Sequence, residues 1–214
     1  YIKDNNNTTK IMKKLLIALS PIIAFGLFKN IVMVYYYTGE SLISLLNPLY
    51  MIIVGVLTSL ITEYLYIRFI LKNDHKETIK TLSTSYSIIP GLLLALVLPI
   101  NTPIWIVFFG AFCATLIGKM IFGGFGKNIF NPALIGYLLI GAAYSSKLGS
   151  YLSIYELDTI GGATPLANLA SLNYIGSYNN IVGNYGNLLN FFTGTIPGMI
   201  GEVSKVLIRL ACIL

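Results

Sequence analysis

The chain has 214 residues, of which 56% are hydrophobic and only 10% are charged, with a formal net charge of +6. Soluble domains carry about a quarter charged residues, so this composition excludes an ordinary soluble domain. Several apolar runs reach about 18 residues, the length that crosses about 30 Å of hydrocarbon. The composition therefore predicts an all-α polytopic membrane protein.

The apolar elements can be placed in chain order behind a polar lead-in over residues 1–12. They are expected at 15–37, 45–71, 85–100, 103–122, 132–144 and 188–214, as about five to six transmembrane helices. Residues 13–144 would hold the first five, and residues 191–214 would begin the next. The third element contains Pro90-Gly91 and Pro99, and the sixth contains Pro197-Gly198. These residues predict broken helices whose freed backbone groups find partners in a protein-lined cavity.

Lysine and arginine residues indicate the orientation, because they collect on one side of the predicted helices. With the N-terminus in the cytoplasm, the polar segment 145–190 lies outside, together with Lys147. The inner side then holds Lys3, Lys10, Lys13, Lys14, Arg68, Lys72, Lys76, Lys80, Lys119 and Lys127. The basic stretch at 72–80 is predicted to be a solvated loop. Nucleic acid is excluded as a partner, because it would require basic residues interleaved with aromatics along a stripe.

Several charged side chains fall inside apolar runs, where a charge is costly unless it is paired or hydrated. Lys29 lies in the first run, so either that helix ends early or the side chain faces protein or water. Glu63 and Lys119 lie near the inner ends of their helices, where snorkelling to the surface is the alternative to an ion or proton path. Glu202 is the deepest and follows a Pro-Gly break, so it is the best candidate for an ion path.

The sequence predicts neither a metal site nor a catalytic residue. Its two cysteines, Cys113 and Cys212, lie in apolar runs without metal-ligand spacing. The glycine-rich stretch at 123–133 lacks the Gly-Lys-Ser/Thr of a phosphate loop and the third glycine of a dinucleotide turn. It is therefore predicted to form a tight turn, with Asn131-Pro132 opening the next helix.

Residues 158–166 form a small glycine-rich loop in a segment that is too polar to cross a membrane. Its glycines leave the backbone uncovered, so a large reagent or enzyme could approach the hydroxyl of Thr164. No base that could activate this hydroxyl is evident, because the chain's one histidine, His75, falls on the other predicted side. The loop is thus either an attachment point or a plain turn.

The same loop resembles a known modification motif. Residues 158–164 read Asp-x-x-Gly-Gly-Ala-Thr and are similar to the flavinylation motif Asp-x-x-Ser/Thr-Gly-Ala-Thr. Residues 87–99, 122–133 and 198–204 are similar to segments of one membrane-protein family. That family comprises RnfD of the Rnf electron-transport complex and NqrB of the Na⁺-translocating NADH:quinone reductase. The short N-terminal lead favours RnfD.

The resemblance implies a covalent FMN, joined through its phosphate to Thr164 by a flavin transferase. Asp158, Gly161, Gly162 and Ala163 complete the motif. Riboflavin is a further flavin that the family implies. The other implications are Rnf subunits as partners, a multi-pass position in the bacterial cytoplasmic (inner) membrane, and the first half of a urea-transporter-like repeat fold. Complexes of this family pass electrons between reduced ferredoxin and NAD⁺ and couple this to Na⁺ or H⁺ transport, so the chain is not expected to be catalytic alone.

The chain departs from the family pattern at two places. Gly161 stands where the family has Ser or Thr. After Ser204 the chain soon stops, whereas the family continues with more helices, which implies a fragment or an early-terminated gene product. The alternative functions are NqrB of the quinone reductase, a solute channel or permease without flavin, and a purely structural membrane scaffold.

Overall fold

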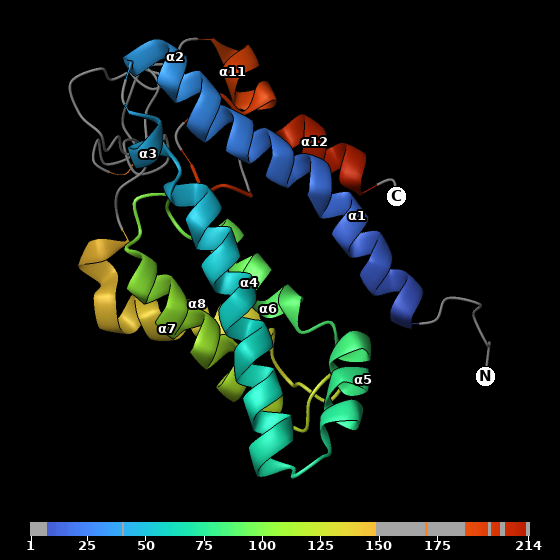
Figure 1. Ribbon diagram of the computed structural model, residues 1–214. Helices are drawn as coiled ribbons and strands as arrows, with labels where there is room; N and C mark the ends of the chain where they lie inside the picture. The colour runs from blue at the N-terminus through green and yellow to red at the C-terminus, as the bar shows by residue number, and fades with distance from the viewer. Residues whose placement is uncertain are drawn as a thin grey trace.

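The structure is a computed structural model that describes residues 8–39, 41–148, 170, 187–196, 198–201 and 204–212. Over these residues its regular elements are all helical (Figure 1). Those in the N-terminal half are α1 (Thr8–Leu27), η1 (Phe28–Met33), α2 (Val34–Thr38), α3 (Leu42–Leu45), α4 (Asn47–Leu65), η2 (Tyr66–Ile70), α5 (His75–Ser85) and α6 (Ile88–Val97). The later ones are α7 (Ile104–Thr115), η3 (Leu116–Met120), α8 (Pro132–Tyr144), η4 (Ser145–Lys147), α11 (Leu188–Thr193) and α12 (Lys205–Ala211). The π-helical turns η1, η2 and η3 continue the α-helices before them.

Among the described residues, two helices are long and apolar enough to cross a membrane. They run over Lys10–Tyr37, with 28 residues, and Asn47–Ile70, with 24 residues. A third crossing results if α5 and α6, which meet at 44°, are counted as one broken span, and Ile104–Met120 is a shorter apolar helix. These elements confirm the polytopic membrane class, whereas the urea-transporter-like arrangement stays a prediction.

Helix α4 turns a face with small and polar side chains to the protein interior and a face with large apolar side chains to the outside. Its buried face repeats every three or four residues and holds Pro48, Met51, Gly55, Thr58, Ser59, Thr62 and Glu63. The opposite face exposes Tyr50, Ile53, Leu57, Ile61 and Leu65. A helix in a soluble protein buries its large apolar side chains. The reverse pattern belongs to a helix that turns its apolar face to lipid and its polar face to neighbouring helices.

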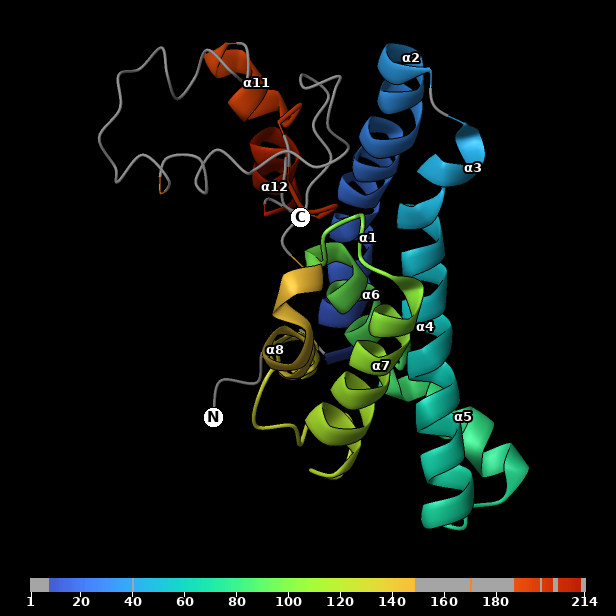
Figure 2. The same ribbon diagram turned by 90° about the vertical axis from the view of Figure 1, so that its left-hand side faces the viewer.

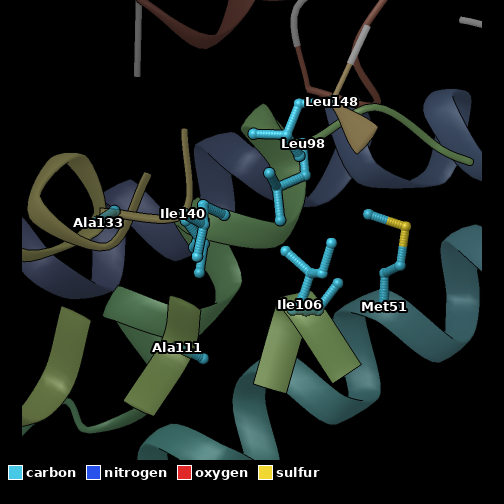
Figure 3. Packing of buried hydrophobic residues seen from close by; sticks show 9 residues of the cluster. Met51, Leu98, Ile106, Ala111, Ala133, Ile140 and Leu148 are labelled. Carbon is cyan, nitrogen blue, oxygen red and sulfur yellow. The ribbon is translucent and has the colours of Figure 1, made fainter. Parts of the chain in front are cut away.

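The main core lies where α4, α6, α7 and α8 meet (Figure 3). It consists of Met51, Leu94, Leu98, Ile106, Val107, Ala111, Ala133, Ile140 and Leu148. Glycines bring the helix backbones together beside this cluster. A Cβ atom on Gly91 would lie 1.9 Å from the carbonyl oxygen of Gly55, and one on Gly136 would lie 2.6 Å from that of Gly110. Such close approach is the usual way in which helices associate in membranes.

The break in the third apolar element lies earlier than predicted. Pro90 is the third residue of α6, where a helix has no backbone hydrogen bond for proline to remove. The chain turns instead at Tyr86, whose φ of 51° is left-handed and ends α5. Helix α6 then ends at Val97, just before Pro99. The prediction of a broken helix is confirmed, but Pro90-Gly91 does not break it.

The predicted loop at 72–80 is wrong over most of its length, because His75–Ser85 forms α5. Asp74 directly precedes the first turn and Glu77 lies within it, positions at which acidic residues favour a helix start. His75 is exposed, as expected, but its Nδ1 lies 3.1 Å from the hydroxyl of Tyr64. Figure 2 shows α5 beside the end of α4 that is remote from α3.

The glycine-rich turn before α8 is confirmed. Gly123, Gly124 and Gly126 have φ values of 102°, 89° and 82°, which a residue with a Cβ rarely adopts. The side chain of Asn131 caps α8 by accepting a hydrogen bond of 3.0 Å from the backbone nitrogen of Ala133. The turn brings α8 back along α7, so that Tyr144 and Trp105 meet edge to face at 4.9 Å.

Candidate functional site

The residues of the predicted flavin site lie outside the described residues. This holds for Asp158, Gly161, Gly162, Ala163 and Thr164, and also for Glu202. Their roles therefore stay predictions from the sequence. The chemistry that the structure does place is a set of buried polar groups between the helices.

A buried ion pair joins the second and fourth predicted elements. Nζ of Lys119, in η3, lies 2.6 Å from Oε2 of Glu63, in α4, and the two side chains are 3% and 1% exposed. Neither side chain reaches the surface, so the snorkelling alternative is wrong for both residues. Because this bond joins two residues that are 56 positions apart in the chain, η3 and the last turns of α4 lie side by side.

The turn between α5 and α6 completes this cluster. The hydroxyl of Ser85 donates to Oε1 of Glu63 and lies 2.9 Å from the hydroxyl of Ser87. Lys119 donates from Nζ to the carbonyl oxygen of Ser85 at 2.8 Å. The bend at Tyr86 therefore has a chemical role, because it brings the carbonyl and hydroxyl groups of Ser85 to the ion pair and the hydroxyl of Ser87 to that of Ser85.

The polar contacts continue one turn further along α4. Oγ1 of Thr115 donates to Oγ of Ser59 at 2.9 Å, and both residues are fully buried. Every buried side-chain nitrogen and oxygen in the described part of the chain has a hydrogen-bond partner. A buried charge is tolerated in a membrane only when it is satisfied in this way. The cluster of Glu63, Lys119, Ser85 and Ser87, with the Ser59–Thr115 pair, is called the buried polar cluster below.

A cavity of about 200 Å³ lies against one side of the buried polar cluster. Lys119 and Ser85 line it together with Asn128, Asn131 and Tyr86. Its walls are otherwise apolar and include Met12 and Leu15 of α1. An ammonium, a hydroxyl and two amides among apolar walls suit the polar edge of a ligand. The volume is below the range of about 300–1,000 Å³ that is usual for whole small-molecule sites.

A second buried lysine lies in the first helix. Lys29 is 1% exposed, and its Nζ donates to the carbonyl oxygen of Ile196 at 2.6 Å. Of the two alternatives for this part of the helix, the structure supports the one in which the side chain faces protein. The described residues between α11 and α12 are not helical, which confirms the predicted interruption of the sixth element. The backbone nitrogen of Gly201 donates to the carbonyl oxygen of Leu96 at 3.0 Å, which fixes this stretch to α6.

The buried pairing of Glu63 with Lys119 is the feature that sequence reasoning missed. A signal was present, because two opposite charges lie near the predicted inner ends of two apolar runs. Two such charges at one depth stabilise each other if the helices touch.

Among the described residues, no group of three His, Cys, Asp or Glu side chains could hold a metal ion.

Known proteins similar to this chain are named as subunits of ion-translocating oxidoreductases. It is 31% identical over 212 residues to the D-type subunit of the proton-translocating ferredoxin:NAD⁺ oxidoreductase complex of Clostridium ljungdahlii, a match that covers 98% of this chain and 58% of that protein. It is 31% identical over 208 residues to the D-type subunit of the Na⁺-translocating complex of Acetobacterium woodii, covering 96% and 57%. The B-type subunit of the Na⁺-translocating NADH-quinone reductase of Ectopseudomonas mendocina is 36% identical over 122 residues, which are 57% of this chain and 29% of that protein.

The two D-type proteins match nearly the whole chain, whereas the B-type protein matches little more than half of it. The chain spans less than two thirds of the length of each of these relatives. Its residues 1–214 also match a family profile from end to end, and the chain therefore belongs to the NQR2, RnfD, RnfE family.

Proposed function

We propose that this chain is a membrane subunit of an ion-translocating ferredoxin:NAD⁺ oxidoreductase complex and that it carries FMN covalently on Thr164. The observation that supports the flavin is the sequence Asp158-x-x-Gly161-Gly162-Ala163-Thr164 in a chain of this family. The support for the complex is the similarity to two proteins that are named as D-type subunits of such complexes.

The threonine oxygen would be joined to the phosphate of FMN as a phosphodiester. This step needs an activated donor, and with FAD as the donor AMP would leave as the threonine hydroxyl loses its proton. Gly161, Gly162 and Ala163 carry almost no side chain, which leaves room for a flavin transferase to approach. The bound flavin supplies the electron transfer, and the protein contributes its position and electrostatic surroundings. Nicotinamide and iron–sulfur sites would lie on other subunits, because this sequence has two cysteines and no dinucleotide turn.

The distribution of basic residues indicates on which side of the membrane the proposed flavin lies. With the N-terminus in the cytoplasm, the segment with Thr164 is extracytoplasmic, and the flavin passes electrons on that side. The two D-type relatives have the same identity to this chain but translocate different ions by name, protons in one and Na⁺ in the other. Overall similarity therefore favours neither ion.

The packing gives the solute channel less support than the redox subunit. Helices α4 and α6 touch backbone to backbone at Gly55 and Gly91, and the Glu63–Lys119 pair fills the space between α4 and η3. An open pathway between these helices would need both contacts to separate. A channel would show solute flux through the isolated protein in liposomes, and a redox subunit would not.

The flavin is tested by co-producing the chain with a flavin transferase and analysing its peptides by mass spectrometry. We expect an added FMN phosphoester on the peptide that contains Thr164, and a fluorescent band in denaturing gels under ultraviolet light. Thr164→Ala should abolish both signals. Thr159→Ala is the matched control in the same loop and should keep them. An unmodified wild-type peptide beside a modified reference substrate, or a signal that survives Thr164→Ala, would overturn the proposal.

A further inference from the structure

We propose that a groove between α4 and α7 binds an acyl chain of an anionic phospholipid, whose headgroup lies at the basic end of α4. The groove has a volume of about 470 Å³. It shares no lining residue with the cavity beside Lys119. The site is therefore separate from the buried polar cluster and independent of the proposed flavin.

The walls of the groove are apolar and turned outward. On the α4 side they include Ile61, Leu65 and Phe69, which are 55%, 46% and 69% exposed. On the α7 side they include Phe108 and Phe112. Helices α4 and α7 pack against each other and run side by side in Figure 2. A groove of this composition in a membrane protein is filled by hydrocarbon.

The side chains of the groove suit a flexible chain better than a second helix. Helices associate in membranes through small residues, which let their backbones approach. The contacts within this protein follow that rule at Gly55–Gly91 and Gly110–Gly136. The groove contains no glycine, alanine or serine among its described lining residues, and its two small residues, Thr58 and Thr62, are only 5% and 6% exposed. Its accessible walls carry the rings of Tyr66, Phe69, Phe108 and Phe112. An acyl chain can thread between such rings, whereas a helix would be held away by them.

The charge at one end of the groove selects an anionic headgroup. Phe69 and Ile70 line the groove, and exposed Lys72 follows two residues later. The basic residues of this region are Arg68, Lys72, Lys76 and Lys80, and the acidic ones are Asp74 and Glu77. Arg68 already donates to the carbonyl oxygen of Asn73 at 2.7 Å, and Lys72 is the first exposed lysine along the chain after the groove residues of η2, which leaves its ammonium for a phosphate. Basic residues directly beyond a membrane helix attract anionic lipids, each by about fivefold in affinity.

Native mass spectrometry of the purified full chain tests the groove with two defined probes. These are phosphatidylglycerol and phosphatidylcholine with the same acyl chains. We expect wild-type protein to retain phosphatidylglycerol more strongly. Leu65→Trp fills the groove and should lower retention of both lipids, whereas Leu57→Trp, similarly exposed on α4 but outside the groove, should not. Lys72→Gln should lower retention of phosphatidylglycerol alone by about fivefold, and Lys127→Gln is its matched control on another exposed loop.

Three outcomes would overturn the proposal. Equal retention of the two lipids would contradict the preference for an anionic headgroup. Equal effects of Leu65→Trp and Leu57→Trp would contradict binding of the acyl chain in the groove. A photo-crosslinker at position 65 that captures another polypeptide in intact membranes, with lipid absent from the product, would assign the groove to a partner helix. All the variants are substitutions at exposed positions, so loss of folding is separable by gel filtration.

Discussion

Two lysines are buried among the described residues, and the protein holds them in different ways. Lys119 is paired with the carboxylate of Glu63 and donates to the carbonyl oxygen of Ser85. Lys29 donates to the carbonyl oxygen of Ile196, a neutral group. The first arrangement joins three elements, α4, η3 and the α5–α6 turn. The second joins the first helix to the stretch before α12.

The difference shows which charge the fold depends on. Removing Lys119 leaves a carboxylate in a low-dielectric interior without its cation, which is a severe cost. Removing Lys29 leaves only a carbonyl oxygen without a donor. It also removes the free-energy cost of burying a charged side chain, which offsets part of the loss. Two lysines with almost equal burial are therefore expected to differ strongly in their contribution to stability.

The largest effect is expected for Lys119→Met. The free energy of unfolding should fall by about 3–5 kcal/mol, because Glu63 remains buried and unpaired. The double variant Glu63→Gln/Lys119→Met should recover much of this loss, since neither charge remains. Unfolding by dodecyl sulfate in mixed micelles measures these differences. Lys127→Met, at an exposed lysine, is the control, and a cost for Lys119→Met no greater than for Lys127→Met would show that the ion pair does not stabilise the fold.

A smaller effect is expected for Lys29→Met, about 1–2 kcal/mol in the same unfolding assay. Its consequences should also be local, because the bond to Ile196 holds this residue against the first helix. Hydrogen exchange should accelerate at the amide of Gly201, which bonds to Leu96, and stay unchanged in α7. Lys13→Met, at an exposed lysine of α1, should alter neither measurement. Faster exchange throughout α7 would contradict a local role for Lys29.

The sequence predicted the helices well because hydrophobic length and proline position are local properties. The interruption near Pro197-Gly198 and the cap at Asn131 follow from residues within a few positions of each other. Helix α5 was missed because its composition is polar, so hydropathy carries no signal for it. The propensity of Asp74 and Glu77 for a helix start was the available local sign.

The buried polar cluster could be predicted only in part, because its bonds join distant positions. The sequence singled out Glu63 and Lys119 as costly charges, but it did not show that they are 2.6 Å apart. That distance depends on the register between α4 and η3, which the hydrogen bond between Ser59 and Thr115 helps to set. The bend at Tyr86, which brings Ser85 to the pair, is also invisible to a search for proline and glycine.

The smallest effect is expected for the neutral bond in the same interface as the ion pair. Thr115→Val keeps the shape of the side chain and removes the hydroxyl that donates to Ser59. Hydrogen bonds between membrane helices contribute about 0.6 kcal/mol on average, so the unfolding free energy should fall by about that amount. The double variant Ser59→Ala/Thr115→Val should cost no more than the single one, because replacing both partners leaves no polar group unsatisfied. If Thr115→Val instead cost as much as Lys119→Met, the helix register, and not the pairing of charges, would be what stabilises this interface.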